Sequence, residues 1–297
     1  MKTIRSPSAM TTWSDQLHRE GVVIGLVPTM GALHDGHRAL IRTGRRQCDA
    51  LVVSIFVNPT QFAPTEDLAS YPRPIEQDRE LCRTEGVDVC FEPAAGAMYP
   101  KGFQTIVTVP AIARRWEGQS RPHHFAGVAT VVTKLFNVVR PGLAFFGQKD
   151  YQQCGVVRQL VKDLNFPIRI VVCPTMREQD GLAMSSRNVF LSTEDRRIAP
   201  IFFHALQAGR QAIENGLSKA ASVEALMRKV IGGVPAIRID YLAVCDPTTL
   251  EPLINIDRQA VILGAVRLGS VRLIDNVHAR STHGSRHHRQ SLVARED

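Results

Sequence analysis

The 297-residue sequence predicts an α/β fold, with a doubly wound parallel sheet followed by a smaller C-terminal α+β domain. Over about the first 175 residues, short apolar runs alternate with helix-length segments, the pattern of parallel strands joined by helices. After residue 174, helices come first and consecutive apolar strands follow. We therefore expect one domain over 1–175, a second over 176–280, and a polar, patternless and disordered tail over 281–297.

The first half contains the segments expected to form the parallel sheet. Most are short apolar runs, rich in β-branched residues and bounded by glycine or proline. Because most gaps between them have the length of a helix, neighbouring strands should pair in parallel through right-handed crossovers. Strands are expected near the N-terminus and at 22–27, 51–57, 87–93, 104–110, 143–147 and 168–174, and helices within 1–20, 38–47, 67–86, 121–142 and after 148.

The second half is expected to begin with helices. Thr193 should cap the first of them, with Glu194 and Asp195 in its first turn, where the helix dipole favours acidic side chains. The remaining elements are expected as a helix over about 218–230 and strands over 238–246, 259–269 and 271–278.

Composition excludes several classes of protein. The N-terminus lacks the apolar core of a secretory signal, and no apolar run approaches the roughly 20 residues that span a bilayer, so no membrane partner is expected. The six cysteines form no C-x-x-C pair, which indicates a reduced, cytoplasmic chain with buried thiols. The net charge is +8, but the basic residues are spread along the chain and aromatics are only 6%. Anionic small substrates explain this charge as well as nucleic acid does, and no nucleic-acid partner is expected.

The stretch VPTMGALHDGH, residues 27–37, marks a junction between a buried strand and a helix. Gly31 and Gly36 let the backbone turn sharply and approach a ligand closely. His34 and His37 stand three residues apart, so both should project from one side of the turn that opens the helix. Because a helix start offers unpaired N–H groups and partial positive charge, this junction predicts a nucleotide phosphate site. Two solvated histidines are the alternative, and the spacing disfavours zinc.

Two further segments carry basic and polar side chains at loop positions. FGQKDYQQ, residues 146–153, ends a strand and opens a helix, so Lys149 should face the same rim as the histidines and neutralise phosphate. MSSRN, residues 184–188, offers two hydroxyls and a guanidinium that can bind phosphate oxygens in a fork. Either segment could instead be an ordinary surface loop. The predicted site collects His34, His37, Lys149 and Arg187.

Candidate substrate contacts follow the strands as well. Gln61 lies in NPTQF after the second apolar run and could hydrogen-bond a polar substrate, or simply face water; Gln153 has the same potential. No side chain resembles a covalent nucleophile, so the predicted chemistry is positioning plus electrostatic stabilisation of a phosphate transfer. Mg²⁺ is expected to bridge the phosphates, and its protein ligands stay unknown, with Asp78 and Asp150 as candidates.

These residues carry a resemblance to a known family. The chain resembles the pantothenate synthetase (pantoate–β-alanine ligase) family from about residue 1 to residue 278. The matching blocks are PTMGALHDGH, VSIFVNPTQF, DLASYPR, RPHHFAGVATVVTKLFNVVRP, FGQKDYQQ, DGLAMSSRN and RLIDN. The first block is a form of the HIGH signature of the nucleotidyltransferase superfamily, and MSSRN stands where the KMSKS-like loop of that superfamily would be. The resemblance implies a Rossmann-like domain and a C-terminal lid domain.

The resemblance also implies a two-step, ATP-dependent ligation. Pantoate attacks the α-phosphorus of ATP to give pantoyl adenylate and pyrophosphate, and the amine of β-alanine then attacks the acyl carbon to release AMP and pantothenate. ATP as substrate, Mg²⁺ and a homodimer are implied. His37, His34, Lys149 and Arg187 would act in catalysis, and Gln61 and Gln153 would hold pantoate. The ATP site would comprise Met30, Gly31, Ala32, Leu33, His34, Asp35, Gly36, His37, Gly147, Gln148, Lys149, Asp150, Met176, Met184, Ser185, Ser186 and Arg187.

Two positions depart from the family's pattern. His123 stands where the family commonly has glycine, and if that glycine needs a positive φ, either His123 is strained or the loop shifts. Gln148 stands where the family commonly has glutamate. Two other functions stay open from the residues alone. One is a nucleotidyltransferase that acts on a phosphorylated acceptor, which would want additional Arg or Lys, and the other is a nucleic-acid-binding protein.

Overall fold

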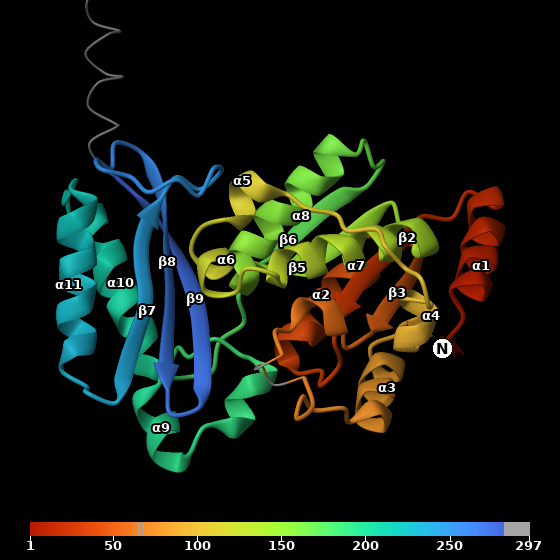
Figure 1. Ribbon diagram of the computed structural model, residues 1–297, viewed down its shortest axis with the longest axis horizontal. Coiled ribbons are helices and arrows are strands. Elements are labelled where there is room, and N and C mark those ends of the chain that lie inside the picture. Colours follow the sequence, from red (N-terminus) through yellow and green to blue (C-terminus); the bar gives the residue numbers. More distant parts are fainter. Residues whose placement is uncertain (65, 67, 282–297) are drawn as a thin grey trace, which may run out of the picture. The chain divides into compact units, whose positions relative to one another are not determined.

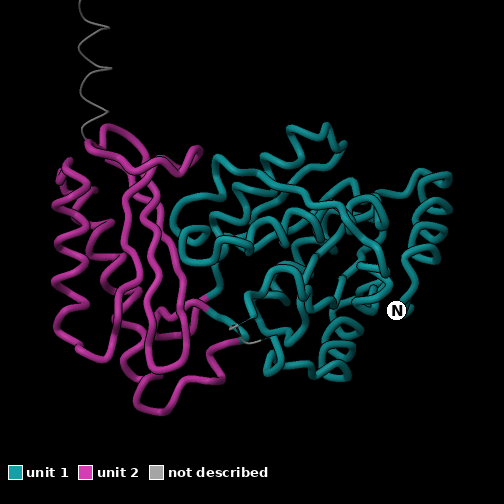
Figure 2. Tube along the Cα trace, in the orientation of Figure 1, with its two compact units in different colours: residues 1–176, 184–186 teal, residues 177–183, 187–297 magenta. Residues whose placement is uncertain are grey.

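The computed structural model describes residues 1–64, 66 and 68–281, which fold into two compact units. Unit 1 comprises Met1–Met176 and Met184–Ser186, and unit 2 comprises Arg177–Ala183 and the chain from Arg187 onward (Figure 2). The chain thus leaves unit 1, returns to it briefly, and then continues in unit 2. Apart from Ser281, the tail expected over 281–297 lies outside the described residues.

Unit 1 is built on a six-stranded sheet in which every neighbouring pair of strands is parallel. The strand order is β1-β4-β3-β2-β5-β6, so the direction of winding reverses between β2 and β5. The predicted doubly wound parallel sheet is therefore confirmed. The strands are β1 (Lys2–Ile4), β2 (Ile24–Thr29), β3 (Ala50–Ile55), β4 (Val89–Phe91), β5 (Leu143–Gly147) and β6 (Arg169–Cys173).

Helices bury both faces of this sheet. The helices α1 (Pro7–Arg19), α7 (His124–Val139) and α8 (Tyr151–Asp163) share one apolar core with the sheet, and α2 (Asp35–Arg45) and α3 (Ile75–Thr84) share another. Neighbouring residues of one strand, such as Leu26 and Val27, belong to different cores, as the period of a strand requires. Short helical turns complete the unit: η1 (Pro59–Gln61), α4 (Ala95–Met98), α5 (Pro110–Ala113), α6 (Glu117–Ser120) and η2 (Gln148–Asp150).

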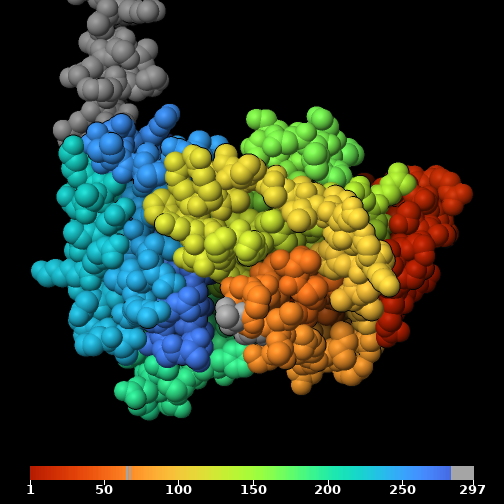
Figure 3. Space-filling model, viewed as in Figure 1, coloured from red at the N-terminus to blue at the C-terminus, as the bar shows by residue number. Residues whose placement is uncertain are grey.

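The strand predicted over 104–110 is wrong. Residues 104–109 form no strand, and Pro110 begins α5. The Val107 N–H donates to the Thr130 hydroxyl at 3.0 Å, and the Ile106 side chain is 72% exposed. Figure 3 shows this yellow-orange part of the chain on the surface of unit 1. The segment has the β-branched composition of a strand. Its Val107 N–H, however, donates to a side chain of α7 and not to the backbone of a neighbouring strand.

Unit 2 contains a three-stranded antiparallel sheet in the order β7-β8-β9, backed by helices α10 and α11 (Figure 1). Ser192, rather than the predicted Thr193, caps the first helix, because its Oγ accepts the Asp195 N–H at 3.1 Å. The elements are η3 (Ser186–Phe190), α9 (Thr193–Ile198), α10 (Pro200–Glu214), α11 (Ala220–Gly232), β7 (Ile237–Cys245), β8 (Gln259–Leu268) and β9 (Val271–Arg280).

Two further predictions from composition can be compared with the fold. Among the described residues, no helix is long and apolar enough to cross a membrane. All six cysteines are buried and none is in a disulfide, as the sequence predicts for structural thiols.

Candidate active site

Two of the segments predicted to form the site lie at the point where the strand order of unit 1 reverses. Strands β2 and β5 are neighbours in the sheet, and they end at Thr29 and Gly147. The loop that carries the histidines leaves the carboxyl end of β2, and η2 with Lys149 leaves the carboxyl end of β5. In open α/β sheets ligands bind outside the carboxyl ends of the strands at such a reversal. The topology of unit 1 therefore brings the two predicted segments to one place.

The two histidines form the start of α2. His34 is its N-cap, and its Nδ1 accepts the Gly36 N–H at 3.1 Å. The His34 N–H in turn donates to Nδ1 of His37 at 3.3 Å, which completes a reciprocal capping box made from two imidazoles. The ring centroids lie 4.2 Å apart. Local hydrogen bonds between neighbouring residues thus fix both rings on one side of the helix start.

Burial sets the charge of the two rings, and these hydrogen bonds set which ring nitrogen carries the proton. Burial lowers the pKa of His34 to about 4, and the positive charge of Lys149 adds to this effect. Burial lowers the pKa of His37 to about 3, with further contributions from His34 and Lys149. Both rings are therefore neutral at pH 7, and because each Nδ1 accepts an N–H, the ring proton must be on Nε2. The pair offers two Nε2–H donors, and Lys149 lies close enough to affect both pKa values.

The stability of the fold should depend on pH through these two rings. Their folded-state pKa values, about 4 and about 3, lie below the ordinary value of 6.5, so below about pH 6.5 the unfolded chain binds protons first. The free energy of unfolding should therefore fall as the pH drops from about 6.5 towards 4, by up to about 1.4 kcal/mol per pH unit for each ring. Urea unfolding at several pH values in this window measures the slope. His34→Gln, which does not titrate, should show a shallower slope, and an unchanged slope would contradict this assignment.

A buried carboxylate supports the turn that precedes the histidines. Asp78 on α3 is 2% exposed, and its two oxygens accept the N–H groups of Ala32 at 2.9 Å and Leu33 at 2.7 Å. Both Gly31 (φ 83°) and Ala32 (φ 50°) are in the left-handed region. Burial raises the pKa of Asp78, and the two N–H bonds oppose that rise. Asp78 thus stabilises a turn with two unusual backbone conformations.

The described residues do not form a resident metal site. Among them, no group of three or more His, Cys, Asp or Glu side chains could hold a metal ion. Of the two candidate magnesium ligands, Asp78 is committed to the turn, and Asp150 lies 3.7 Å from the Lys149 ammonium. The residues present therefore do not fit a magnesium ion held by the protein alone.

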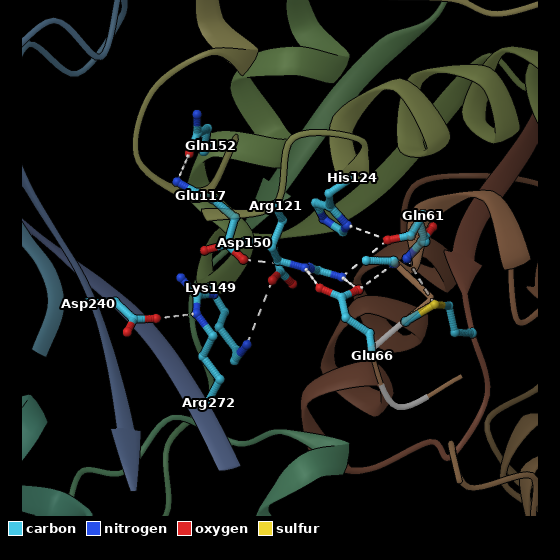
Figure 4. A network of polar contacts seen from close by, with 12 residues as sticks. Gln61, Glu66, Glu117, Arg121, His124, Lys149, Asp150, Gln152, Asp240 and Arg272 are labelled. Atoms are coloured by element: carbon cyan, nitrogen blue, oxygen red, sulfur yellow. Dashed lines mark hydrogen bonds and ion pairs between the residues drawn. The ribbon is translucent and has the colours of Figure 1, made fainter. Parts of the chain in front are cut away.

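Gln61 is held beside the histidine loop rather than facing water. Its side chain belongs to η1 and is 8% exposed. The Asn58 amide donates to Gln61 Oε1 at 3.0 Å, and Gln61 Nε2 donates to the Met30 sulfur at 3.0 Å. Gln61 is one of the labelled residues in Figure 4. The bonds on both ends of this amide select one orientation for it.

The two glutamines at the start of α8 differ in their surroundings. Gln153, the predicted substrate contact, is partly exposed. Gln152, which sequence reasoning missed, is buried and accepts the Glu117 N–H at 3.1 Å. Its amide nitrogen donates to the carbonyls of Ile112 and Arg115, both at 2.8 Å. Gln152 therefore holds α5 and α6 onto α8, and nothing in the local sequence QQ distinguishes this structural glutamine from its neighbour.

A cavity of about 440 Å³ lies along α2 within unit 1. Its lining comprises Asp35, Arg38, Ala39, Arg42, Thr43, Arg46, Met176 and Met184. The Met184 N–H donates to the Met176 carbonyl at 3.0 Å, so the two methionines predicted to contact ATP lie together. Ser186 Oγ lies 3.2 Å from the Tyr71 hydroxyl. Arg187 belongs to unit 2, and its place at the phosphates stays a prediction.

Comparison with known proteins assigns the family. A sequence model described as pantoate-beta-alanine ligase matches residues 2–278. The chain belongs to the pantoate–β-alanine ligase family. It is 52% identical over 261 residues to a pantothenate synthetase of Syntrophotalea carbinolica, an alignment that covers 88% of this chain and 92% of the relative. It is also 50% identical over 277 residues to a pantothenate synthetase of Moorella thermoacetica, with 93% of this chain and 98% of the relative covered.

Solved structures of pantothenate synthetases have the same fold. The structure from Thermus thermophilus aligns with a TM-score of 0.89 at 47% identity, covering 93% of this chain and 99% of that one. A pantoate–β-alanine ligase from Francisella tularensis, complexed with beta-gamma ATP and β-alanine, aligns with a TM-score of 0.77 at 34% identity, covering 93% and 97%. The chain is an ATP-binding ligase that makes pantothenate from pantoate and β-alanine.

The structure also answers the question raised by one departure from the family's pattern. His123, which stands at a position where pantoate–β-alanine ligases commonly have glycine, adopts φ −96° as the N-cap of α7. Because this φ is ordinary for any residue, the predicted strain at His123 is absent. The other departure, Gln148, begins η2 beside Lys149, and nothing in the structure explains that substitution.

Proposed function

We propose that this ligase acts through a pantoyl adenylate. A carboxylate of pantoate attacks the α-phosphorus of ATP, the bond to the β,γ-pyrophosphate breaks, and pyrophosphate leaves. The amine of β-alanine then attacks the acyl carbon, the bond to AMP breaks, and pantothenate, AMP and a proton are released. Joining the carboxylate to AMP creates a good leaving group, which a free carboxylate lacks at neutral pH. The observation that carries this proposal is the pair of neutral Nε2–H donors next to Lys149 at the strand-order reversal.

The proposed role of this cluster is to stabilise the charge that develops on the phosphates. His34 and His37 donate through Nε2–H, and Lys149 supplies a full positive charge; Arg187 adds a guanidinium that can bind two oxygens. The rings act as hydrogen-bond donors, since their lowered pKa values leave no imidazolium at pH 7. Donors that hydrogen bonds already hold in place need no reorganisation as the charge moves, which favours the transition state over the bound substrate.

The proposed nucleotide site follows the histidine loop and the cavity along α2. The turn 30–33, the start of α2 and Gly147, Gln148, Lys149 and Asp150 would contact the phosphates and the ribose. The adenine would lie in the cavity with Met176 and Met184, whose flexible thioethers suit an aromatic base. Ser185, Ser186 and Arg187 would close over the phosphates, with residues 176–280 as a lid.

Pantoate is proposed to bind through neutral side chains. Gln61, and Gln153 at the start of α8, would donate to and accept from a hydroxy acid, and Gln61 would also meet β-alanine. A phosphorylated acceptor would instead need uncompensated positive charge. Arg121 lies beside Gln61, but its guanidinium is paired with Glu66 at 2.6 and 2.8 Å. This neutral surrounding favours pantoate over the phosphorylated acceptor of related nucleotidyltransferases.

Pyrophosphate–ATP exchange tests the adenylate. The enzyme with ATP, Mg²⁺ and pantoate, but without β-alanine, should exchange labelled pyrophosphate into ATP, and omitting pantoate should abolish the exchange. AMP should accumulate in amounts above the enzyme concentration only after β-alanine is added. Pyrophosphate release that requires β-alanine from the start would overturn the adenylate.

The assignment of Gln61 to pantoate predicts the effect of Gln61→Ala. Removing an amide that both orients and hydrogen-bonds the substrate should raise the KM for pantoate by about tenfold and leave the KM for ATP within about twofold. Steady-state rates at varied pantoate and varied ATP measure both values. Unchanged pantoate KM and kcat would show that Gln61 does not contact pantoate.

The proposal also covers the oligomeric state and the cellular location of the enzyme. We infer a homodimer from the family resemblance, and sedimentation of the purified chain tests it. We infer a cytoplasmic location because six buried thiols outside any disulfide suit a reducing compartment.

A further inference from the structure

A partly buried polar cluster holds Gln61 from its backbone side. The Gln61 carbonyl accepts from Arg121 Nη2 at 3.2 Å and lies 3.1 Å from His124 Nδ1 (Figure 4). Burial, together with the positive charge of Arg121, lowers the pKa of His124 to about 4, so the ring is neutral at pH 7. Because a carbonyl can only accept, the proton of His124 lies on Nδ1. Two donors from the segment that opens α7 thus converge on the residue proposed to hold pantoate.

Arg121 is itself fixed by a carboxylate from the loop that follows Gln61. Its Nε and Nη2 donate to the two oxygens of Glu66 at 2.6 and 2.8 Å, and Glu66 Oε2 also accepts the Ala63 N–H at 3.1 Å. The Glu117 carboxylate lies 3.5 Å from Arg121 Nη1. The side chains of Arg121 and Glu66 are only 15% and 23% exposed. A bidentate hydrogen-bonded ion pair with little solvent exposure fixes the position of a guanidinium far better than an ion pair on an exposed surface does.

The same loop contacts α7 directly on its other side. The Asn58 amide donates to the Gly127 carbonyl at 3.1 Å as well as to the Gln61 side chain. A Cβ placed on Gly127 would lie 2.4 Å from the Thr60 carbonyl oxygen, which shows how closely the helix approaches η1. Gln61 is therefore held through its side chain, through its carbonyl and by the packing of η1 against α7. Arg121 connects the Gln61 carbonyl to Glu66 in the loop that follows.

We propose that Arg121 is a positioning residue for pantoate: paired with Glu66, it holds the Gln61 backbone so that the Gln61 amide meets the substrate. Arg121 acts through Gln61 and touches no reacting atom. The inference rests on the proposed role of Gln61 in binding pantoate. It predicts a larger effect on pantoate than on ATP, because Asp78 holds the backbone of the ATP loop at Ala32 and Leu33, whereas Gln61 contacts that loop through the Met30 sulfur.

Arg121→Lys tests this in the full-length enzyme. Lysine keeps the charge but cannot donate simultaneously to both Glu66 oxygens and the Gln61 carbonyl with the same geometry. The KM for pantoate should rise about tenfold, while the KM for ATP stays within about twofold. Glu66→Gln, which keeps the size of the side chain and removes its charge, should raise the pantoate KM in the same direction by a smaller factor. Equal increases in both KM values would overturn the inference.

A matched control separates positioning from general loss of stability. Arg79 makes the same two-bond pair with Glu92, at 2.8 and 2.6 Å, in the same unit but without contact to Gln61. Arg79→Lys should leave the pantoate KM within about twofold, whatever it does to the thermal midpoint. A tenfold rise in this control would show that the effect at Arg121 is not specific, and would also overturn the inference.

A double variant distinguishes failure of this inference from failure of the proposed function. If Arg121 acts through Gln61, adding Arg121→Lys to Gln61→Ala should change the pantoate KM by less than about twofold. If the full tenfold effect persists on top of Gln61→Ala, Arg121 acts by another route and the inference is wrong. If Gln61→Ala alone leaves the pantoate KM unchanged, the proposed pantoate contact is wrong. If Gln61→Ala raises it and Arg121→Lys does not, only the present inference is wrong.

Discussion

His37→Ala is expected to lower kcat for adenylate formation by about a hundredfold, the usual loss for one preorganised donor to a developing charge. His37 contributes a neutral Nε2–H, since its Nδ1 already accepts the His34 N–H at 3.3 Å. Alanine removes the donor proposed to contact the phosphates and also removes the acceptor from the capping box. Single-turnover formation of pyrophosphate from ATP and pantoate measures the chemical step without product release.

Two conservative variants separate these losses. His37→Gln places an amide nitrogen near the position of Nε2, whereas His37→Asn places its amide near Nδ1 and can still accept the His34 N–H. We expect glutamine to retain more activity than asparagine, because the proposed role of His37 needs a donor at the position of Nε2. The reverse order would show that the ring serves mainly to cap α2.

Lys149→Ala should lower turnover at least about tenfold, since it removes the full charge beside the rings, and full activity would exclude Lys149 from the site.

Gly127→Ala should destabilise the fold and impair pantoate binding together. A Cβ at this position would lie 2.4 Å from the Thr60 carbonyl oxygen and 2.6 Å from the Gln61 nitrogen, so backbone must move. Helix propensity alone predicts the opposite sign, because alanine is favoured over glycine inside a helix by about 1 kcal/mol. We expect the steric cost of the added Cβ to exceed the gain in helix propensity. The net effect should be a loss of about 2 kcal/mol in the free energy of unfolding and a fall of at least about tenfold in kcat/KM for pantoate.

Gly96→Ala in α4 provides the control, because a Cβ there meets nothing within 4 Å. It should leave the free energy of unfolding unchanged or slightly higher, and kcat/KM unchanged. Urea unfolding and pantoate kinetics of the two variants, measured side by side, decide the sign. A Gly127→Ala enzyme as stable and active as the parent would show that η1 can shift away from α7 without cost.

The sequence predicted the sheet because its signal is local. Each buried strand is a short β-branched run, and the helix-length gaps between most of them leave few topologies. The same local signal produced the false strand at 104–110. That run fits an extended surface segment as well as a strand, and whether it pairs depends on a neighbour far away in the chain. At the start of α9, Ser192 and Thr193 are adjacent hydroxyl residues that could each act as the cap, and only the Asp195 bond identifies Ser192.

The candidate site shows the same difference between local features, which the sequence predicts, and contacts between distant residues, which it does not. The histidine pair was visible because its two rings and the helix start lie within four residues of one another. The distant contacts that hold the loops of unit 1 in place were not visible: Asp78 holds the turn before the histidines from 45 and 46 residues away, Glu66 pairs with Arg121 across 55 residues, and Gln152 holds Glu117 across 35. From the sequence alone, Asp78 was instead one of two candidate magnesium ligands. A sequence shows which residue types could do chemistry, whereas the partners that orient them come from the folded topology.

The buried thiols have a practical consequence for following the motion of the proposed lid. Burial raises the pKa of Cys154 to about 12 and raises the pKa values of Cys48 and Cys173, so these sulfurs stay protonated and react slowly with maleimides. All six native cysteines are buried. A fluorophore can therefore be attached to one introduced surface cysteine on each unit without first deleting any native sulfur, and a change in the distance between the two dyes during turnover tests the proposed motion.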